Sequence, residues 1–442
     1  MYHWAMLTKT IAAISTALQD GAISIIRLSG PDALAIADSV FSGDVLHQPA
    51  NTIRYGTILK DGEPLDEVLL SVFRAPHSYS GMDMVEINAH GGVLITRRIL
   101  QLLLSKGAVL AEPGEFTRQA FLTGRIDLAQ AEAVNDMITA TSDAGARIAV
   151  QGIRGSVRRL LEPLIDDILN IIAQIEVNID YPEYEDVEEL TSETLLPEIT
   201  RWIDRIGRIL ERAAFGQQVK KGIDTVILGR PNAGKSSLLN ALLEEDKAIV
   251  TDIPGTTRDV VEGRVILDGI QLNLLDTAGI RETEDTVEKL GVERSRKAAR
   301  EADLVILVRD PLTSEPDLDL PELVEGKQLI EVWNKSDVAP REGLSISAKT
   351  GEIEPLLQEI RARFEQGLDT KEALLSSERQ IGLLRRAQAS MMNAQAVLQD
   401  GGLPDMAEID IQEAHSCLKE ILGEVHREDL LDALFSRFCL GK

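Results

Sequence analysis

The sequence predicts a multidomain protein of mixed α+β and α/β class, in which a nucleotide-binding domain interrupts a helical one. Short strand-like runs between turn residues predict a small N-terminal α+β domain over residues 1–120. Helical apolar spacing fills residues 121–215 and returns over 371–442, and since neither segment has another obvious partner we expect one discontinuous helical domain. Residues 216–370 alternate apolar runs with charged helices, which predicts an inserted, mostly parallel sheet covered on both faces.

The N-terminal domain shows strands by their alternation and helices by their spacing. Strands are expected at Ala22–Leu28, Thr52–Leu59, Leu69–Phe73 and Met84–Asn88, each bounded by turn residues. A helix is expected over Val93–Ser105, because leucines and isoleucines recur at helical spacing until a Lys-Gly pair ends it.

The helical segments each show an apolar face. In the first segment it consists of Leu161, Leu164, Ile165, Ile168, Ile172 and Ile175. In the second it consists of Ile381, Leu384, Met391, Ala394, Leu398, Leu418, Ile421 and Leu422.

The inserted domain's expected strands are Leu272–Leu275, Leu304–Val308, Leu329–Trp333 and Leu344–Ile346.

A P-loop lies between the apolar run Thr225–Leu228 and a helix beginning near Ser237. The stretch Gly229-Arg-Pro-Asn-Ala-Gly-Lys-Ser has the spacing at which glycines turn backbone N–H groups around a phosphate. Lys235 would neutralise the β/γ oxygens and the Ser236 hydroxyl would hold Mg²⁺. The alternative, a glycine turn that binds nothing, does not explain this spacing directly after a buried strand.

Four further segments follow the P-loop in the order found in guanine-nucleotide proteins. They are Thr256-Thr257 within Gly-Thr-Thr-Arg-Asp, Asp276-Thr-Ala-Gly279, Asn334-Lys-Ser-Asp337 and Ser347-Ala-Lys349. Asp337 is placed to accept both N–H donors on the guanine edge, a pair of donors that adenine lacks. The set resembles the translation-factor-related GTPases and predicts a Ras-like GTPase domain that binds GTP and Mg²⁺. The expected GTP contacts are Asn232, Ala233, Gly234, Lys235, Ser236, Ser237, Thr251, Asp252, Ile253, Pro254, Gly255, Thr256, Thr257, Asp276, Thr277, Ala278, Gly279, Asn334, Lys335, Asp337, Ser347, Ala348 and Lys349.

The residue that orients the attacking water is left open by these motifs. Ile280 stands where Ras-like proteins carry a glutamine, and an isoleucine cannot orient water. The candidates are the acidic residues just downstream, Glu282, Glu284, Asp285 and Glu288, although such a cluster is also typical of a solvated switch face.

Composition bounds the class of protein. The formal net charge of −26 argues against a chain that wraps nucleic acid unaided, because Lys and Arg supply most phosphate affinity. Apolar stretches are too short to span a membrane, and the first residues lack the features of a secretory signal, so we expect a cytoplasmic protein. Two cysteines, Cys417 and Cys439, are too few for a disulfide framework.

The chain end Cys439-Leu-Gly-Lys442 after a helical segment resembles one family, the tRNA-modification GTPases called MnmE or TrmE. Further matching stretches are Arg27-Leu-Ser-Gly30, Val85–Gly92, Pro113–Phe116 and Asp127–Ala133, together with the P-loop and Gly-Thr-Thr-Arg-Asp. The resemblance covers nearly the whole chain, including the interrupted helical domain.

The resemblance implies a function that spacing does not show. Family members form homodimers through the N-terminal domain and work in a heterotetramer with the flavoprotein MnmG. Together they add an aminomethyl-type group, carboxymethylaminomethyl or aminomethyl, to C5 of the wobble uridine of certain tRNAs. The one-carbon unit comes from 5-formyl- or methylene-tetrahydrofolate. The matching folate positions in this chain are Arg27, Glu86, Arg125 and Lys442.

The resemblance also implies how GTP is hydrolysed and where the modification chemistry takes place. It implies Mg²⁺ on Ser236 and Thr257, and K⁺ on Asn232, Thr251, Ile253 and Thr256. Glu288 matches the family's water-orienting glutamate, and Cys439 matches the tail cysteine, which otherwise reads as a small hydrophobe near a helix end.

Two rival functions differ in class. A ribosome-assembly GTPase that binds rRNA would bring a basic RNA-binding module, and a septin- or dynamin-like GTPase would bring an amphipathic basic segment; neither feature is found in this sequence.

Overall fold

A computed structural model describes residues 7–180, 192–230, 232–244, 261–267, 270–275, 298–313, 327–365, 375–425, 428–436 and 438–441. The chain forms two compact units. The first comprises residues 1–135, 153–177 and 408–442, and the second comprises 136–152 and 178–407. The domain boundaries expected from the sequence, at 120, 215 and 370, stay predictions.

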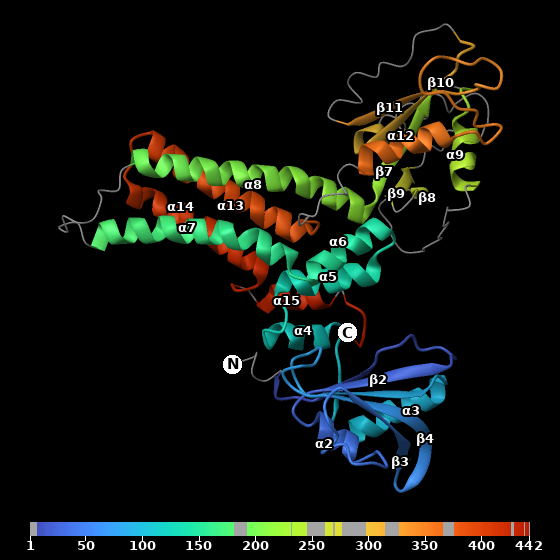
Figure 1. The fold of residues 1–442 in the computed structure, drawn as a ribbon, viewed down its shortest axis with the longest axis vertical. Helices are drawn as coiled ribbons and strands as arrows, with labels where there is room; N and C mark the ends of the chain where they lie inside the picture. The colour runs from blue at the N-terminus through green and yellow to red at the C-terminus, as the bar shows by residue number, and fades with distance from the viewer. Residues whose placement is uncertain are drawn as a thin grey trace. The chain divides into compact units, whose positions relative to one another are not determined.

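The first unit contains a six-stranded sheet in the order β3-β4-β5-β2-β1-β6 (Figure 1). Its strands are β1 (Ile11–Ile14), β2 (Ile23–Ser29), β3 (Thr52–Lys60), β4 (Glu63–Phe73), β5 (Met84–His90) and β6 (Val109–Leu110). Neighbours are antiparallel except β1 and β6, which are parallel. Asp61 and Gly62 adopt positive φ angles of 54° and 87° in the β3–β4 turn. All four predicted N-terminal strands are confirmed.

The two faces of this sheet are covered differently because side chains alternate along each strand. Helices α2 (Ala33–Asp38) and α3 (Val93–Ser105) cover one face, where Ile26 and Leu28 of β2 are fully buried among them. The range of α3 is the one that the sequence predicts. Arg27 lies between these two residues and therefore points to the opposite face.

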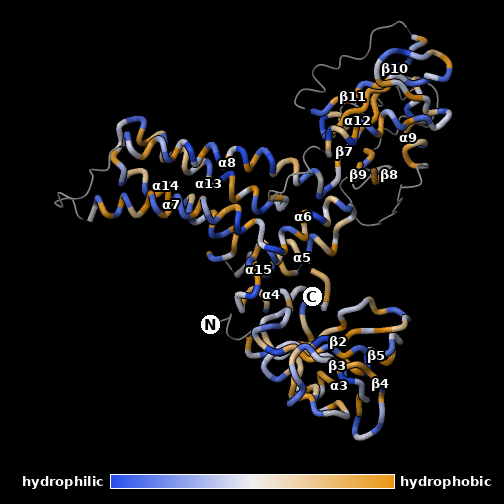
Figure 2. Tube along the Cα trace, viewed as in Figure 1, coloured by the Kyte–Doolittle hydropathy of each residue, from blue (hydrophilic) through white to orange (hydrophobic). Residues whose placement is uncertain are grey.

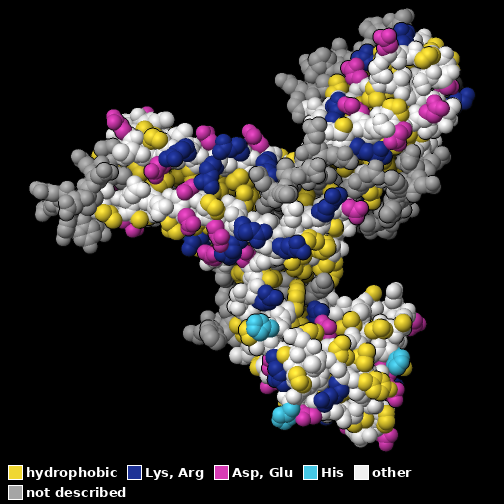
Figure 3. Space-filling model, in the orientation of Figure 1, with side chains coloured by type: hydrophobic (Ala, Val, Ile, Leu, Met, Phe, Trp, Pro, Cys, Tyr) yellow, Lys and Arg dark blue, Asp and Glu magenta, His cyan; other side chains and the backbone are white. Residues whose placement is uncertain are grey.

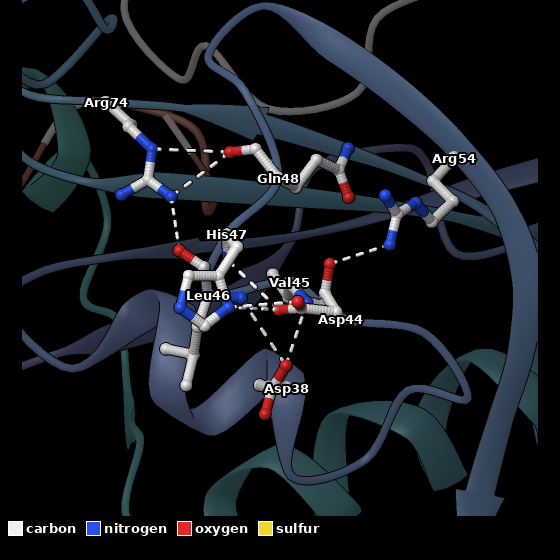
Figure 4. Close-up of polar contacts among 8 residues, drawn as sticks. All are labelled: Asp38, Asp44, Val45, Leu46, His47, Gln48, Arg54 and Arg74. Carbon is white, nitrogen blue, oxygen red and sulfur yellow. Dashed lines mark hydrogen bonds and ion pairs between the residues drawn. The ribbon is translucent and has the colours of Figure 1, made fainter.

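The loop after α2 is fastened by its own polar groups (Figure 4). The Asp38 carboxylate accepts the N–H of Val45 at 2.8 Å, which closes the loop after the helix. Arg74, the residue after β4, donates to the Leu46 carbonyl at 2.6 Å, and Arg54 of β3 donates to the Asp44 carbonyl at 2.8 Å. Backbone carbonyls without strand partners are thereby satisfied.

Helices of the first unit come from both halves of the chain. Besides α2 and α3 they are α4 (Glu115–Leu122), α5 (Leu128–Thr139), α7 (Ser156–Asp180), α14 (Pro404–Leu422) and α15 (Glu428–Phe435), of which α5, α7 and α14 extend by a few residues beyond the unit. The predicted apolar face of α7 is buried at every position. Leu431 and Phe435 of α15 pack with Leu128 at the start of α5, although about three hundred residues separate them.

The second unit contains a five-stranded sheet in the order β11-β10-β7-β9-β8. Its strands are β7 (Ile223–Gly229), β8 (Val261–Leu267), β9 (Ile270–Leu275), β10 (Leu304–Arg309) and β11 (Gln328–Trp333). The first four in this order are parallel, and Figure 2 shows the hydrophobic colour along the central strands. Helices α9 (Lys235–Glu244) and α12 (Glu354–Glu365) pack on one face, and Ala298, Ala299 and Ala302 pack on the other.

Two details of this sheet differ from the sequence prediction. Residues Leu344–Ile346 do not form a strand; Ser345 makes one bridge with Trp333 before the chain turns back through Ser347, whose N–H bonds the Glu352 carbonyl. The antiparallel edge strand β8 was not predicted, and it pairs with β9 as a hairpin.

The remaining helices of the second unit are α6 (Asp143–Ile153), α8 (Ser192–Lys221) and α13 (Glu378–Gln399). Helices α8 and α13 lie side by side (Figure 1), and Gln395 donates to the Thr200 hydroxyl at 2.7 Å. The expected packing of helices from before and after the inserted domain is confirmed for this pair. Within the described residues, none of the helices combines the length and apolar character needed to cross a membrane.

Candidate nucleotide site and N-terminal site

The P-loop leaves β7 and enters α9 through backbone conformations that favour glycine. Gly229 has φ +154° and Gly234 has φ +95°, while Asn232 between them has φ +62°. A Cβ on Gly229 would strike the Val308 carbonyl of the neighbouring strand β10, and one on Gly234 would strike the side chain of Asn334. The loop is thus packed against its neighbours at both glycines, and a P-loop of this spacing would turn its backbone N–H groups toward a phosphate.

Lys235 lies folded over this loop at the start of α9. Its Nζ donates to the carbonyls of Gly229 at 2.9 Å and Arg230 at 2.7 Å. Burial lowers the pKa of the Lys235 amine, since it disfavours the charged form. A phosphate bound in the loop would provide a negatively charged partner that stabilises the protonated amine. This ion pair is the interaction expected of a P-loop lysine.

Asn334 connects the P-loop with the loop that begins at Ser347. Its side-chain amide is buried, donates to the Ala233 carbonyl at 2.8 Å and accepts the Ala348 N–H at 3.0 Å. Asn334 follows β11 directly, so the ends of two sheet strands and the third loop are held in one place.

Asp337 and Ser347 face each other at the same end of the sheet. The Ser347 hydroxyl donates to Asp337 Oδ1 at 2.8 Å, and Ser347 itself is fully buried. This bond orients the carboxylate that would accept the two N–H donors of guanine. The expected guanine-recognition residues Asn334, Asp337, Ser347 and Ala348 are therefore brought together beside the P-loop, whereas the Lys349 side chain is exposed.

Asp310 is a residue of this site that none of the sequence motifs indicates. It follows the last residue of β10, its side chain is 8% exposed, and Oδ2 pairs with the Lys335 amine at 2.6 Å. Burial alone would raise the pKa of Asp310, but the hydrogen bonds from Lys335 and from the Leu312 N–H, together with the Lys335 charge, lower it overall. Because Lys335 has φ +63°, the ion pair holds a strained residue of the guanine loop. A carboxylate at the end of an apolar parallel strand is the signal that could have found it.

Several predicted site residues lie outside the described residues. They are Thr251, Asp252, Ile253, Pro254, Gly255, Thr256, Thr257, Asp276, Thr277, Ala278, Gly279, Glu288 and Lys442. Ser236 and Ser237 are described in the first turn of α9, where Ser236 is half-buried and Ser237 exposed.

A second polar site lies in the first unit, on the sheet face opposite α2 and α3. Arg27 Nη2 and Nε both donate to Glu86 Oε1, at 2.7 and 2.9 Å. The guanidinium carbon stands 5.6 Å from the ring centres of both Tyr79 and Phe116. Arg27 Nη1 donates to the Gly441 carbonyl at 3.3 Å, so the C-terminal tail reaches this site.

Two further predicted residues lie close by, Arg125 of the folate set through a contact and Cys439 of the tail through its position in the sequence. Arg125 is exposed and donates from Nε to the Ser78 carbonyl at 3.3 Å, next to Tyr79. Cys439 is a free, exposed thiol two residues before Gly441. The structure thus joins Arg27, Glu86 and the tail directly, and links Arg125 to them through the loop that carries Tyr79.

A P-loop joined to an Asn-Lys-Ser-Asp corner on a mostly parallel sheet defines a GTP-binding protein of the GTPase class. The family model described as the MnmE helical domain matches residues 128–439, and the model described as the GTP-binding protein TrmE N-terminus matches residues 10–125. The tRNA modification GTPase MnmE of Ligilactobacillus salivarius (strain UCC118) is 49% identical over 459 residues, with 98% of each chain covered. That of Lactococcus lactis subsp. cremoris (strain SK11) is 48% identical over 447 residues, again with 98% of each covered. The chain belongs to the MnmE family of tRNA modification GTPases.

Proposed function

We propose that this protein hydrolyses GTP to GDP and phosphate and uses that reaction in tRNA modification. The observation that carries the proposal is the assembled guanine corner, in which Asn334 ties the P-loop to Ala348 while Ser347 orients Asp337. The relationship to tRNA modification GTPases over 98% of the chain supports the same function.

We propose further that the protein's substrate nucleoside is the wobble uridine of certain tRNAs. It would add a carboxymethylaminomethyl or aminomethyl group at C5, as a homodimer in a heterotetramer with the flavoprotein MnmG, in the cytoplasm. Tetrahydrofolate, as the 5-formyl or methylene form, would supply the one-carbon unit. Cys439, exposed in the tail, would act in this chemistry.

The N-terminal site has a chemistry suited to a folate. Glu86 offers a carboxylate to ring N–H donors, and Arg27 holds that carboxylate by two bonds to one oxygen. The partly exposed Tyr79 ring beside the guanidinium would supply apolar surface for a flat heterocycle, while the fully buried Phe116 ring supports the guanidinium. Arg125 and Lys442 would contribute positive charge toward the folate's carboxylates.

The proposal gives each residue of the nucleotide site a task. Lys235 would neutralise the β- and γ-phosphate oxygens, Ser236 and Thr257 would hold Mg²⁺, and Glu288 would orient the attacking water. Mg²⁺, when bound, would stabilise the charge that moves during phosphoryl transfer. Ser236 is half-buried in the first turn of α9, directly after the lysine that covers the loop, and this position fits a role as a Mg²⁺ ligand.

K⁺ would supply the remaining positive charge beside the phosphates. Asn232, Thr251, Ile253 and Thr256 are its proposed ligands. Asn232 fits, because it stands in the P-loop at φ +62° with an exposed side chain, and an amide oxygen suits a hard monovalent cation. The alternative source is an arginine finger, for which Arg258 and Arg281 are the candidates in the expected switch loops.

GTPase rates in matched K⁺ and Na⁺ salts test this assignment. We expect the natural chain to be strongly stimulated by K⁺ at constant ionic strength, and the Asn232→Ala chain to lose that stimulation while still binding GTP. Rates should also rise with protein concentration if paired nucleotide domains close over the ion. Equal rates in the two salts would return the role to the arginines, which Arg258→Ala and Arg281→Ala would then separate.

A further inference from the structure

We propose that the C-terminal tail is held by a latch whose parts are Ser15, Arg27 and the backbone of Gly441, and that Ser15 is a positioning residue for Cys439. The seating of the tail follows from contacts within the first unit. Its consequence for tRNA modification rests on the proposed function of Cys439.

Two donors from neighbouring parts of the sheet meet on one tail carbonyl. Ser15 Oγ donates to the Gly441 carbonyl oxygen at 3.0 Å, and Arg27 Nη1 donates to the same oxygen at 3.3 Å. Ser15 follows β1 and is itself fixed, since its N–H bonds the Ile25 carbonyl of β2 at 2.8 Å. A carbonyl with two lone pairs is satisfied by two such donors, so the tail is bound to the sheet at a defined point.

Gly441 permits a close backbone approach that another residue would prevent. Its φ of +87° lies in the left-handed region, and an added Cβ would come within 3.0 Å of backbone atoms of both Ile14 and Ser15. The tail backbone therefore packs directly on the end of β1. A substitution here meets both the conformational penalty and the contact.

The tail is also anchored on the other side of Cys439. Phe438 packs with Phe435 of α15, and both belong to the apolar cluster that includes Leu128. The Gly114 N–H points to the Cys439 carbonyl at 3.4 Å. Cys439 therefore lies between two fixed points, the buried Phe438 and the hydrogen-bonded Gly441, while its thiol is exposed.

This arrangement implies that the thiol is presented from a fixed backbone beside the Arg27–Glu86 pair. Arg27 serves both sides, because the same guanidinium bonds Glu86 and the tail carbonyl. Ser15 has no bond to Glu86 in the described structure, so changing it tests the latch without removing the charged pair.

The test is the mobility of a nitroxide label attached to Cys439 in the full-length protein, measured by electron paramagnetic resonance. Cys417 is 1% exposed, so labelling should be confined to Cys439, and Cys439→Ser should abolish it. We expect an immobile spectrum in the natural sequence. Loss of one hydrogen bond in Ser15→Ala should shift the balance of open and latched tails by about five-fold. Gly441→Ala should leave the label mainly mobile. The alanine would be strained at a positive φ angle, and its Cβ would collide with the end of β1, so both effects disfavour the latched tail.

Matched variants separate positioning from a general structural effect. Ser15→Thr keeps the hydroxyl and should retain the immobile spectrum. Ser105→Ala removes a serine hydroxyl whose bond is to Leu102 within α3, and it should change nothing. GTPase rates should be unchanged in all of these variants, while tRNA modification falls in Ser15→Ala and recovers in Ser15→Thr.

An immobile label in both Ser15→Ala and Gly441→Ala would overturn the latch. If the label is mobile in Ser15→Ala but that variant still modifies tRNA fully, the latch stands and Ser15 is not a positioning residue. The same result would count against the proposed function of Cys439. The spectrum and the modification assay therefore distinguish the failure of each claim.

Discussion

The Asp337→Asn protein is expected to lose its preference for GTP and to hydrolyse xanthosine triphosphate instead. The carboxylate of Asp337 would accept the ring N–H and the exocyclic amine of guanine, and Ser347 already orients it through a 2.8 Å bond to Oδ1. An amide replaces one acceptor by a donor, which opposes the guanine amine but matches the oxygen that xanthine carries there. Losing one hydrogen bond to a charged group and leaving the guanine amine opposite a donor, at about 1.5 kcal/mol for each effect, predicts roughly a 10²-fold weaker affinity for GTP.

The measurement is a competition between the two nucleotides in binding and in turnover. Asp400→Asn makes the same chemical change at the exposed C-terminal end of α13 and should leave the preference unchanged. If Asp337→Asn kept the full preference for GTP, guanine recognition would have to be assigned to another residue.

Glu288→Ala is expected to reduce GTP turnover by roughly 10²-fold or more, the usual scale for a residue that positions or deprotonates the attacking group. The reason is that Ile280 provides no group to orient water where Ras-like proteins use glutamine. Nucleotide affinity should stay within a few-fold of the natural value, because the glutamate is expected to act on the water and to leave GTP binding to other residues.

Single-turnover hydrolysis at saturating GTP separates this effect from weaker binding. Glu284→Ala is the matched control, since it removes a neighbouring carboxylate from the same acidic segment. The assignment would be reversed if Glu284→Ala stopped turnover and Glu288→Ala left it intact.

The sequence predicted those parts of the fold that depend on local patterns. The range of α3 follows from helical spacing ended by Lys-Gly, and the positions of β10 and β11 follow from short apolar runs. Leu344–Ile346 has the composition of a strand, but after one bridge to Trp333 the chain enters the turn at Ser347. Composition alone does not show that the turn forms in place of a longer strand.

Pairings between distant residues could not be predicted in the same way. Asp310 reaches Lys335 only because β10 and β11 lie parallel and end together. Ser15 reaches Gly441 across 426 positions of the chain, and a serine in a polar N-terminal segment carries no local signal for such a contact. For the nucleotide site, motif spacing predicted the residues but not the bonds by which Asn334 unites them.

Nucleoside analysis of bulk tRNA from cells that lack this chain tests the central claim most directly. The account predicts that wobble uridines lose their C5 aminomethyl-type group and regain it when the natural chain is restored, but not when Glu288→Ala is supplied. Wobble uridines that remain fully modified without the chain would contradict the account.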